Sequence, residues 1–232
     1  MDFGGFLMLM NGSGGNSRVV TYADNNSITT DPWTTTFAVD LGAGFGMHTN
    51  PLARSGASVL AIDSSEQLLS DLRQSCVGLP VQAVQADLLG FPSHISARPD
   101  LILCMGDTIT HLASETDVEG LIRSVARSLR PGGTFVATFR DYRSVPTGDS
   151  RFIPVRSDSD RVHTCFLEEL PQHVLVHDIV HEREGDRWRT RVSSYRKLRL
   201  SPDAIVAFAD ASGLRCRVEP GPRGMLKIRA DA

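Results

Sequence analysis

The sequence predicts an α/β fold: a Rossmann-like, mostly parallel seven-stranded sheet with helices on both faces and an antiparallel β insert before the last helix. Between residues 37 and 139, short apolar runs alternate with segments of helical spacing, which is typical of β-α-β units in a parallel sheet. Between residues 151 and 200, long β-rich runs are separated only by short turns. Such short connections join antiparallel strands.

Five apolar runs are the expected parallel strands, at residues 37–41, 58–62, 81–86, 99–105 and 134–139. Helices are expected between them at residues 47–55 and 118–129. A further helix is expected to begin after Ser64 or Ser65, because a serine hydroxyl can accept a hydrogen bond from a free N–H group at a helix start.

The insert and the C-terminal segment complete the expected fold. The insert strands are expected at residues 162–170, 173–181 and 188–200. Ser201, Pro202 and Asp203 then favour a helix start, and the helix should end at Gly213. The last two strands are expected at residues 214–218 and 225–228.

The composition bounds the function before any motif is considered. The chain has 232 residues and a formal net charge of −3, which argues against a nucleic-acid-binding protein with a basic face. No apolar run approaches the roughly 20 residues of a membrane span, and residues 6–10 are too short for a signal-peptide core. The four cysteines contain no CxxC pair, which favours free thiols and a cytoplasmic location. Both a monomer and a homodimer are compatible with this composition.

We therefore expect one domain with an insertion. Its parts are a flexible lead-in (residues 1–36), a core (37–142 and 201–232) and a lid formed by the insert (143–200).

A glycine-rich turn follows the first strand and has the spacing Gly-x-Gly-x-Gly. Gly42, Gly44 and Gly46 can adopt positive φ and let the backbone approach a ligand closely. Asp63 and Asp87 end the second and third strands, at the sheet edge where open parallel sheets bind ligands. At these places Asp63 can accept hydrogen bonds from ribose hydroxyls, and Asp87 can accept one from an adenine amino group.

These motifs together resemble the class I S-adenosylmethionine-dependent methyltransferases. The similar segments are residues 39–46, 61–63, 85–88, 100–104 and 129–133. The resemblance implies S-adenosylmethionine as the cofactor, with the glycine turn at its methionine end. The implied cofactor-binding residues are Asp40, Gly42, Ala43, Gly44, Gly46, Asp63, Ser64, Asp87, Leu88, Met105 and Gly106. A nicotinamide-dependent dehydrogenase is the next alternative, which Met47 and the Pro131-Gly132-Gly133 run disfavour.

Two further segments resemble the glycine N-methyltransferase subgroup of small-molecule methyltransferases. One is residues 106–112 after the fourth strand, and the other is residues 140–142 after the fifth. The resemblance implies a loop role for Gly106, Thr108 and His111 and an anion-binding role for Arg140, with Tyr142 beside it. The expected acceptor-binding residues after these two strands are Asp107, His111, Arg140 and Tyr142. The sequence departs from the subgroup at Asp107, where the subgroup has Asn, and in its short, Gly-rich N-terminus. Tyr195 in the insert is a further acceptor-binding candidate, although packing is the commoner role of such an aromatic residue.

The expected function is in-line methyl transfer to a small molecule, and the resemblance favours nitrogen as the acceptor atom. The expected acceptor is a heterocyclic or anionic metabolite of secondary metabolism. A base is needed only for a protonated nucleophile. His111 is the first candidate because the unperturbed pKa of histidine is near neutrality, and Asp107 is the second.

Three alternatives accompany this expectation. They are an O-methyltransferase of a hydroxylated aromatic, a non-catalytic S-adenosylmethionine-binding regulator and a nucleic-acid methyltransferase. The last is disfavoured because residues 106–109 lack the Asn/Asp-Pro-Pro-Tyr/Phe motif of base methylation.

No metal site is expected. His173, His177 and His181 are four positions apart, but their neighbours are β-branched and apolar, and four residues of a strand span roughly 13 Å. The grouping of Asp107, His111 and Asp141 has no specific metal-binding spacing.

Overall fold

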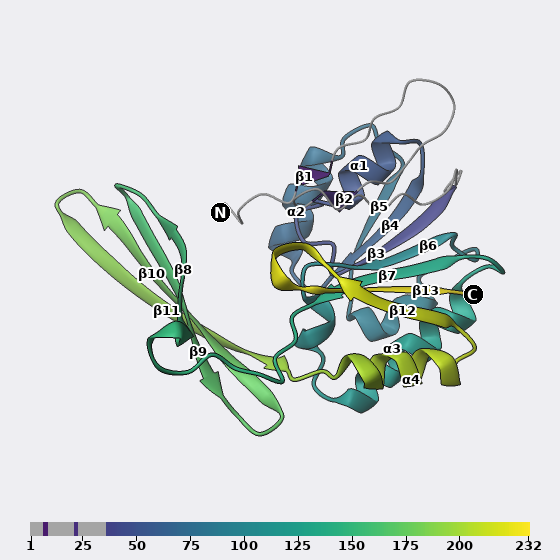
Figure 1. Ribbon diagram of the computed structural model, residues 1–232. Helices are drawn as coiled ribbons and strands as arrows, with labels where there is room; N and C mark the ends of the chain where they lie inside the picture. The colour runs from purple at the N-terminus through teal and green to yellow at the C-terminus, as the bar shows by residue number, and fades with distance from the viewer. Residues whose placement is uncertain (1–6, 9–20, 23–35) are drawn as a thin grey trace.

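The seven-stranded sheet is present in the computed structural model (Figure 1), which describes residues 7–8, 21–22 and 36–232. Its strand order is β12-β13-β7-β6-β3-β4-β5, and only the pairings of β13 are antiparallel. The strands are β3 (Phe37–Leu41), β4 (Ser58–Asp63), β5 (Val81–Gln85), β6 (Leu101–Cys104), β7 (Thr134–Phe139), β12 (Arg215–Pro220) and β13 (Leu226–Asp231). Both the predicted fold class and the five parallel strands are confirmed, with shifts of one or two residues at some ends.

Helices cover both faces of this sheet. In Figure 1, α1 (Thr49–Arg54) and α2 (Glu66–Ser75) lie on one side, and α3 (Glu115–Ser128) and α4 (Pro202–Ala211) lie on the other. The Ser65 hydroxyl caps α2, as predicted. The prediction for α3 was wrong by three residues at its start, because Ser114 accepts the N–H of Asp117 and begins the helix there.

The insert forms a separate antiparallel sheet, here called the insert sheet, which projects from the core in Figure 1. Its order is β11-β10-β9-β8. The strands are β8 (Phe152–Ser157), β9 (Arg161–Glu169), β10 (His173–Glu184) and β11 (Arg187–Leu198). The sequence prediction missed β8, which contains a proline and an irregular register between Pro154 and Arg156. Proline interrupts the pattern of a strand and is tolerated at a sheet edge, where β8 lies.

One face of the insert sheet packs on the core. Tyr195 is paired with Val176 in the ladder, so these side chains lie on the same face. Val176 is buried in a cluster with Tyr142, at the end of the core segment, and with Val145 of the connection that follows it. The face that carries Tyr195 and Lys197 is therefore the inner face, a choice that residue alternation alone left open.

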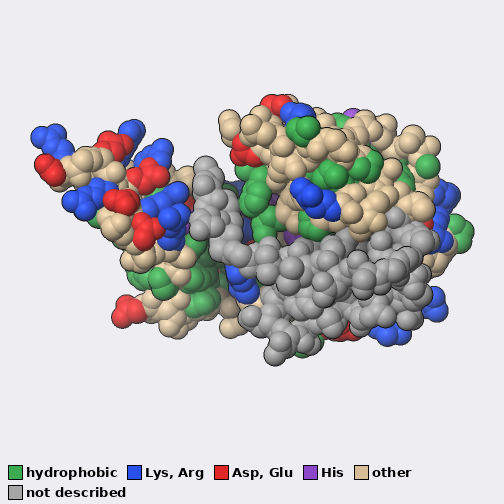
Figure 2. Space-filling view, turned by 90° about the horizontal axis from the view of Figure 1, so that it is seen from above, with side chains coloured by type: hydrophobic (Ala, Val, Ile, Leu, Met, Phe, Trp, Pro, Cys, Tyr) green, Lys and Arg blue, Asp and Glu red, His purple; other side chains and the backbone are tan. Residues whose placement is uncertain are grey.

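A single arginine ties the insert sheet to its two connections with the core. The Arg199 guanidinium donates hydrogen bonds to the carbonyl oxygens of Tyr142, Arg143 and Leu170 at 2.8–3.1 Å. Farther out, the insert sheet carries oppositely charged side chains close together (Figure 2). These include the ion pairs Arg156–Asp158, Arg161–Glu182 and Arg189–Glu184.

Most of the expected lead-in at residues 1–36 lies outside the described residues. The exceptions are residue 36 and two short strands, the first of which lies within the apolar run at residues 6–10. Those strands, β1 (Leu7–Met8) and β2 (Thr21–Tyr22), pair antiparallel with each other. Within the described part, none of the helices combines the length and the apolar character that crossing a membrane would require.

Candidate active site

The three glycines of the turn after β3 have different surroundings. Gly42 has φ +71°, and a Cβ built on it would lie 2.3 Å from Cγ2 of Thr108. A Cβ on Gly46 would lie 3.0 Å from Leu72 of α2. Gly44 also has positive φ, but no described atom lies within 4 Å of its Cβ position. Two of the glycines are thus required by packing within the protein, and only Gly44 leaves open space at its missing side chain.

Asp40 is buried at the start of the same turn. One of its carboxylate oxygens, Oδ2, accepts a hydrogen bond of 2.6 Å from the Thr49 hydroxyl. The other oxygen, Oδ1, is buried and has no hydrogen-bond partner among the described residues. Burial raises the pKa of Asp40, and the nearby His48 opposes that rise. An unpaired buried oxygen is costly, so this position fits a hydrogen-bond donor on a bound molecule. Ala43, the next predicted residue in the turn, is also buried.

Asp63 joins the glycine turn to the end of β4. Its Oδ2 accepts the N–H of Gly44 at 2.9 Å and its Oδ1 accepts the N–H of Ser65 at 2.8 Å. Each carboxylate oxygen has a second lone pair, so Asp63 retains capacity for the two hydroxyls of a ribose. Ser64 beside it is exposed.

Asp87 caps the short helix η1 (Leu88–Ser93) at the end of β5. Its Oδ1 accepts the N–H of Leu89 at 2.7 Å, and its side chain is exposed. Leu88 is half-buried next to it. The carboxyl ends of β3, β4 and β5 therefore bring the predicted cofactor-binding residues to one edge of the sheet.

The loop after β6 contains two successive left-handed residues. Met105 is buried, and Gly106 and Asp107 follow with φ +71° and +74°. Aspartate tolerates this conformation better than most residues, but it still costs free energy. The space at the Cβ position of Gly106 is open among the described residues.

Asp107 is held in this conformation by three donors. Its carboxylate accepts hydrogen bonds of 2.9 Å from the backbone N–H of Arg140 and from the Tyr142 hydroxyl. It also forms an ion pair of 3.0 Å with Nζ of Lys197 on β11. All three side chains that meet here are buried. The two carboxylate oxygens are thus engaged by three donors from separate parts of the chain, which indicates that Asp107 positions the loop.

Lys197 was not among the predicted site residues. It is buried, it donates a second hydrogen bond to the backbone oxygen of Asp107, and its ammonium lies 5.7 Å from the Tyr195 ring centroid. Desolvation lowers the pKa of Lys197, and the attraction of Asp107 opposes this. A possible signal was its shared strand face with Tyr195, but its partner 90 positions away could not be read from the local pattern.

His111 ends the short helix η2 (Thr108–His111), and its ring lies 5.4 Å from that of Tyr195. Desolvation and the Lys197 ammonium lower the pKa of His111 to about 4. The unperturbed pKa of histidine, on which the choice of His111 was based, is thus shifted here by burial and by a lysine that the local sequence does not reveal. At neutral pH the imidazole is uncharged and can accept a hydrogen bond.

The remaining predicted acceptor-binding residues lie around the same loop. Arg140 is exposed and donates from one guanidinium nitrogen to the Arg223 carbonyl at 3.0 Å. Tyr142 is buried behind Asp107, and burial followed by the Asp107 charge raises its pKa. Tyr195 is half-buried, and burial raises its pKa as well. The structure thus brings Arg140, His111 and Tyr195 to the side of the loop that faces the insert sheet.

The three histidines of β10 have separate partners. His173 contacts the Ala113 carbonyl, His177 contacts Glu168 and Ser194, and His181 contacts Thr190. They do not converge on one point, as predicted from their strand composition.

Comparison with known proteins shows what this chain is similar to. The family model described as "Methyltransferase domain" matches residues 38–133, which contain the glycine turn, Asp63, Asp87 and Asp107. Residues 38–133 are therefore similar to the methyltransferase domain family. The insert sheet and the last helix lie outside the matched part.

Three curated relatives are similar to part of this chain. Cypemycin N-terminal methyltransferase from Streptomyces sp is 34% identical over 53% of this chain and 54% of its own length. Glycine/sarcosine N-methyltransferase from Halorhodospira halochloris is 28% identical over 46% of this chain and 41% of its own length. Ubiquinone biosynthesis O-methyltransferase from Methylococcus capsulatus is 33% identical over 42% of this chain and 40% of its own length. The matches thus span about half, or less, of the length of these relatives.

Two solved structures share the fold over most of the chain. The CcbJ methyltransferase from Streptomyces caelestis superposes with a TM-score of 0.73, 23% identity and coverage of 86% of this chain and 84% of its own. The SAM-bound amino pentose methyltransferase CalS10 from Micromonospora echinaspora superposes with a TM-score of 0.71 and 16% identity. The superposition covers 85% of this chain and 84% of CalS10. At these identities the likeness concerns the fold, and that fold includes the parts outside the methyltransferase domain.

Proposed function

We propose that this protein is an S-adenosylmethionine-dependent methyltransferase that methylates a nitrogen atom of a small molecule. The observation that carries the proposal is the set of groups at the carboxyl edge of the methyltransferase domain. This set combines an open position at Gly44, the buried and unpaired Oδ1 of Asp40, and Asp63 directly bonded to the turn. Its chemistry fits a bound molecule with an amino group and a ribose.

Each part of this edge has a proposed contact. Asp63, with Ser64 beside it, holds the ribose, and Asp87 with Leu88 holds the adenine. Asp40, the backbone from Gly42 to Gly46, Met105 and Gly106 hold the methionine end. S-adenosylmethionine supplies a methyl group already activated by a sulfonium. The protein's main task is then to align the acceptor in line with the breaking bond, and such alignment is worth roughly 7–11 kcal/mol.

The proton chemistry of the site supports nitrogen as the acceptor atom. A phenol has to lose a proton whose pKa is about 10, and a base of pKa about 4, such as His111, takes such a proton poorly. An acceptor nitrogen that is uncharged at neutral pH, such as that of a weakly basic N-heterocycle, already carries a free lone pair, so His111 needs only to accept a hydrogen bond from the acceptor. An alkyl amine, with a pKa of about 10, would have to lose a proton as a phenol does. Two of the relatives are N-methyltransferases by name.

The acceptor is proposed to lie between the loop after β6 and the inner face of the insert sheet, which acts as a lid. His111 and Tyr195 contact it, and Arg140 binds an anionic or electron-rich part of it through its remaining N–H donors. Asp107, Tyr142 and Lys197 hold this loop in place. A heterocyclic or anionic metabolite, such as an intermediate of secondary metabolism, fits this set.

O-methylation of a hydroxylated aromatic is the second candidate, favoured by the ubiquinone biosynthesis relative. It requires that another group, or the cofactor's own field, deprotonate the acceptor. A regulator that binds the cofactor without turnover is a third possibility that the same experiment addresses.

The test is a radiolabelled methyl-transfer screen over small amines, N-heterocycles and phenols. We expect label on an amine or heterocycle nitrogen, and label only on phenol oxygens would overturn the choice of nitrogen. In parallel, Asp63→Ala should weaken S-adenosylhomocysteine binding at least about tenfold in calorimetry, because it removes a charged hydrogen-bond acceptor. The matched control is Asp71→Ala, an exposed carboxylate on α2, which should bind as the parent does. No binding by the parent would overturn the whole proposal.

We further propose that the protein acts in the cytoplasm without nucleic acid or membrane, as a monomer or homodimer. All four cysteines are free, which supports a reducing compartment.

A further inference from the structure

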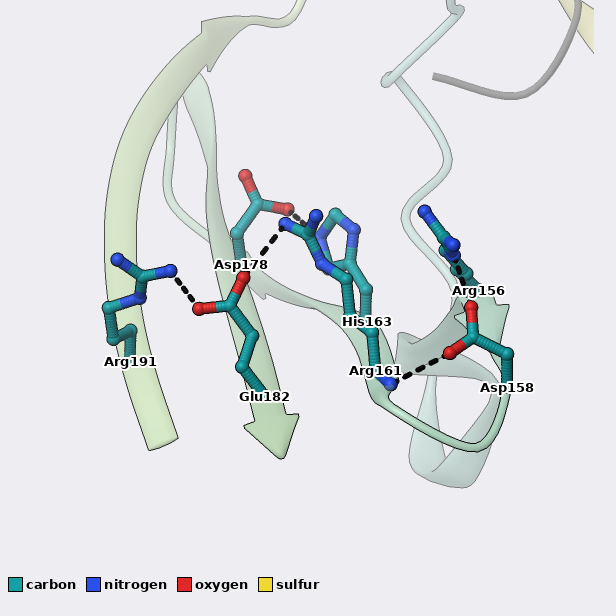
Figure 3. Close-up of polar contacts among 7 residues, drawn as sticks. All are labelled: Arg156, Asp158, Arg161, His163, Asp178, Glu182 and Arg191. Atoms are coloured by element: carbon teal, nitrogen blue, oxygen red, sulfur yellow. Dashed lines mark hydrogen bonds and ion pairs between the residues drawn. The ribbon is translucent and has the colours of Figure 1, made fainter. Parts of the chain in front are cut away.

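Three potential metal ligands meet on the inner face of the insert sheet, outside the site described above. His163 and Cys165 lie on β9, and Asp178 lies on β10. Nε2 of His163 lies 2.8 Å from Oδ1 of Asp178, and Sγ of Cys165 lies 2.9 Å from the same oxygen. Sγ and Nε2 are 3.9 Å apart. Figure 3 shows His163 and Asp178 directed toward each other from their two strands.

The strand register explains why these side chains meet. Cys165 is directly paired with Asp178 in the antiparallel ladder, and His163 is two positions farther along β9. Side chains of directly paired residues share a face, and the diagonal neighbour at ±2 lies on that face too. The backbone ladder therefore fixes all three groups at one place, half-buried on the face that also carries Tyr195.

A nucleophilic triad does not account for this arrangement. In a Cys-His-Asp triad, the two nitrogens of the imidazole face the thiol and the carboxylate separately. Here the same nitrogen, Nε2, lies nearest to both groups, and the thiol bonds directly to the carboxylate. The thiol therefore lacks the separate base that would activate it as a nucleophile.

We propose that His163, Cys165 and Asp178 form a three-ligand site for Zn²⁺, with its fourth position open to a water molecule or another ligand. A thiolate, an imidazole and a carboxylate are common zinc ligands, and the thiolate disfavours Mg²⁺ and Ca²⁺. Tetrahedral zinc bonds of about 2.0–2.3 Å would place the three ligand atoms about 3.4–3.6 Å apart. The observed separations of 2.8, 2.9 and 3.9 Å differ from these by well under 1 Å, which small side-chain rotations can supply.

The surroundings provide support beyond the ligands themselves. Tyr195 is the diagonal neighbour of Asp178 on the same face of the sheet, a position from which its side chain can orient a metal-binding carboxylate. The open position would lie on the inner face, on the side of the sheet that carries Tyr195.

Zinc binding has a defined proton balance. The Cys165 thiol gives up its proton, the sulfur–zinc bond forms, and one proton per ion passes to the buffer. No oxidant or reductant takes part.

The experiment uses the untagged full chain and Zn²⁺ titrations by calorimetry in two buffers of different ionisation enthalpy. We expect one Zn²⁺ per chain and the release of about one proton. Cys165→Ser and Asp178→Asn should each weaken binding at least about tenfold. The controls are Cys216→Ser and His181→Gln, which remove a thiol and an imidazole outside the cluster and should leave binding unchanged. Failure of the parent to bind Zn²⁺, or binding by both ligand variants as tight as the parent's, would overturn the proposal.

Titration with Co²⁺ provides a second readout. The parent should show a near-ultraviolet thiolate-to-cobalt charge-transfer band that Cys165→Ser lacks and Cys216→Ser retains. The absence of that band in the parent would overturn Cys165 as a ligand. If Cys165→Ser does not give the parent's far-ultraviolet circular dichroism, His163→Gln takes its place, and undiminished Zn²⁺ binding by that variant would overturn the site.

Discussion

Gly42 and Gly44 lie two positions apart, and both adopt a left-handed backbone conformation. Their surroundings in the structure differ. The contact between Gly42 and Thr108 joins the loops after β3 and β6, so it fixes the distance between two parts of the candidate site. Gly44 has no such neighbour among the described residues, and its N–H is instead bonded to Asp63.

We predict that Gly42→Ala destabilises the protein more than Gly44→Ala does. Both variants place a Cβ on a left-handed residue, at a cost of about 1–2 kcal/mol. Gly42→Ala adds a steric clash with Thr108, worth about 1–3 kcal/mol more. Urea unfolding measures the difference, and equal midpoints for the two variants would contradict it. Thr108→Ala in the Gly42→Ala background should restore part of the lost free energy of unfolding.

At the scale of elements, the insert sheet is positioned by a small apolar contact and by Arg199. Leu167, Val174 and Val176 are buried against Tyr142 and Val145. The far end of the sheet makes its own ion pairs and does not share this contact. The placement of the proposed lid therefore depends on a few side chains near its base.

We predict that Val176→Asp lowers the free energy of unfolding by more than about 2 kcal/mol, because it buries an unpaired charge in this contact. Acceptor turnover should fall with it at temperatures where the variant is still folded. Val192→Asp is the matched control, since Val192 lies on the opposite face of the same sheet and is 61% exposed. It should change stability by less than about 0.5 kcal/mol. Similar losses for both variants in urea denaturation would show that the inner face does not support the lid.

At the scale of the whole molecule, several groups with shifted pKa values together determine how the free energy of unfolding depends on pH. The pKa of His111 is lowered to about 4, and desolvation also lowers that of His48. The pKa of Asp100 is lowered, with hydrogen bonds from Phe37, Thr36 and Arg130 outweighing its burial. Groups of this kind contribute stability above their unfolded pKa and lose it as the pH falls through the folded value. Asp40 has a raised pKa and acts in the opposite sense.

We predict that the free energy of unfolding decreases as the pH falls from about 6.5 to about 4. In this range the unfolded chain takes up a proton at His111 that the folded chain does not. The lowered pKa of His48 acts in the same direction. His111→Gln should flatten the dependence in this window while leaving the loss near the ordinary pKa of Asp100. Urea titrations at a series of pH values check this, and a slope as steep in the variant as in the parent would refute the role of His111.

Much of this molecule could be predicted from local patterns. Apolar runs and serine caps located the strands of the sheet and the start of α2, because burial on both faces and hydrogen bonding of free N–H groups are local demands. The same reasoning placed Asp63 and Asp87 at one edge. It failed for β8, where proline and an irregular register hide the strand, and for the start of α3, where Ser114 was not considered.

The sequence by itself determined the class of the fold, the methyltransferase-like motifs and the order of the elements, since these depend on residues close together in the chain. Only the tertiary structure decided which face of the insert sheet turns inward and that Lys197 neutralises Asp107. It also showed that Thr108 occupies the space left by Gly42, that the pKa of His111 is near 4, and that His163, Cys165 and Asp178 meet. The physical reason is the same in each case: charge, desolvation and steric contact depend on distances between atoms, and those distances are set by strand register and packing between residues far apart in the sequence.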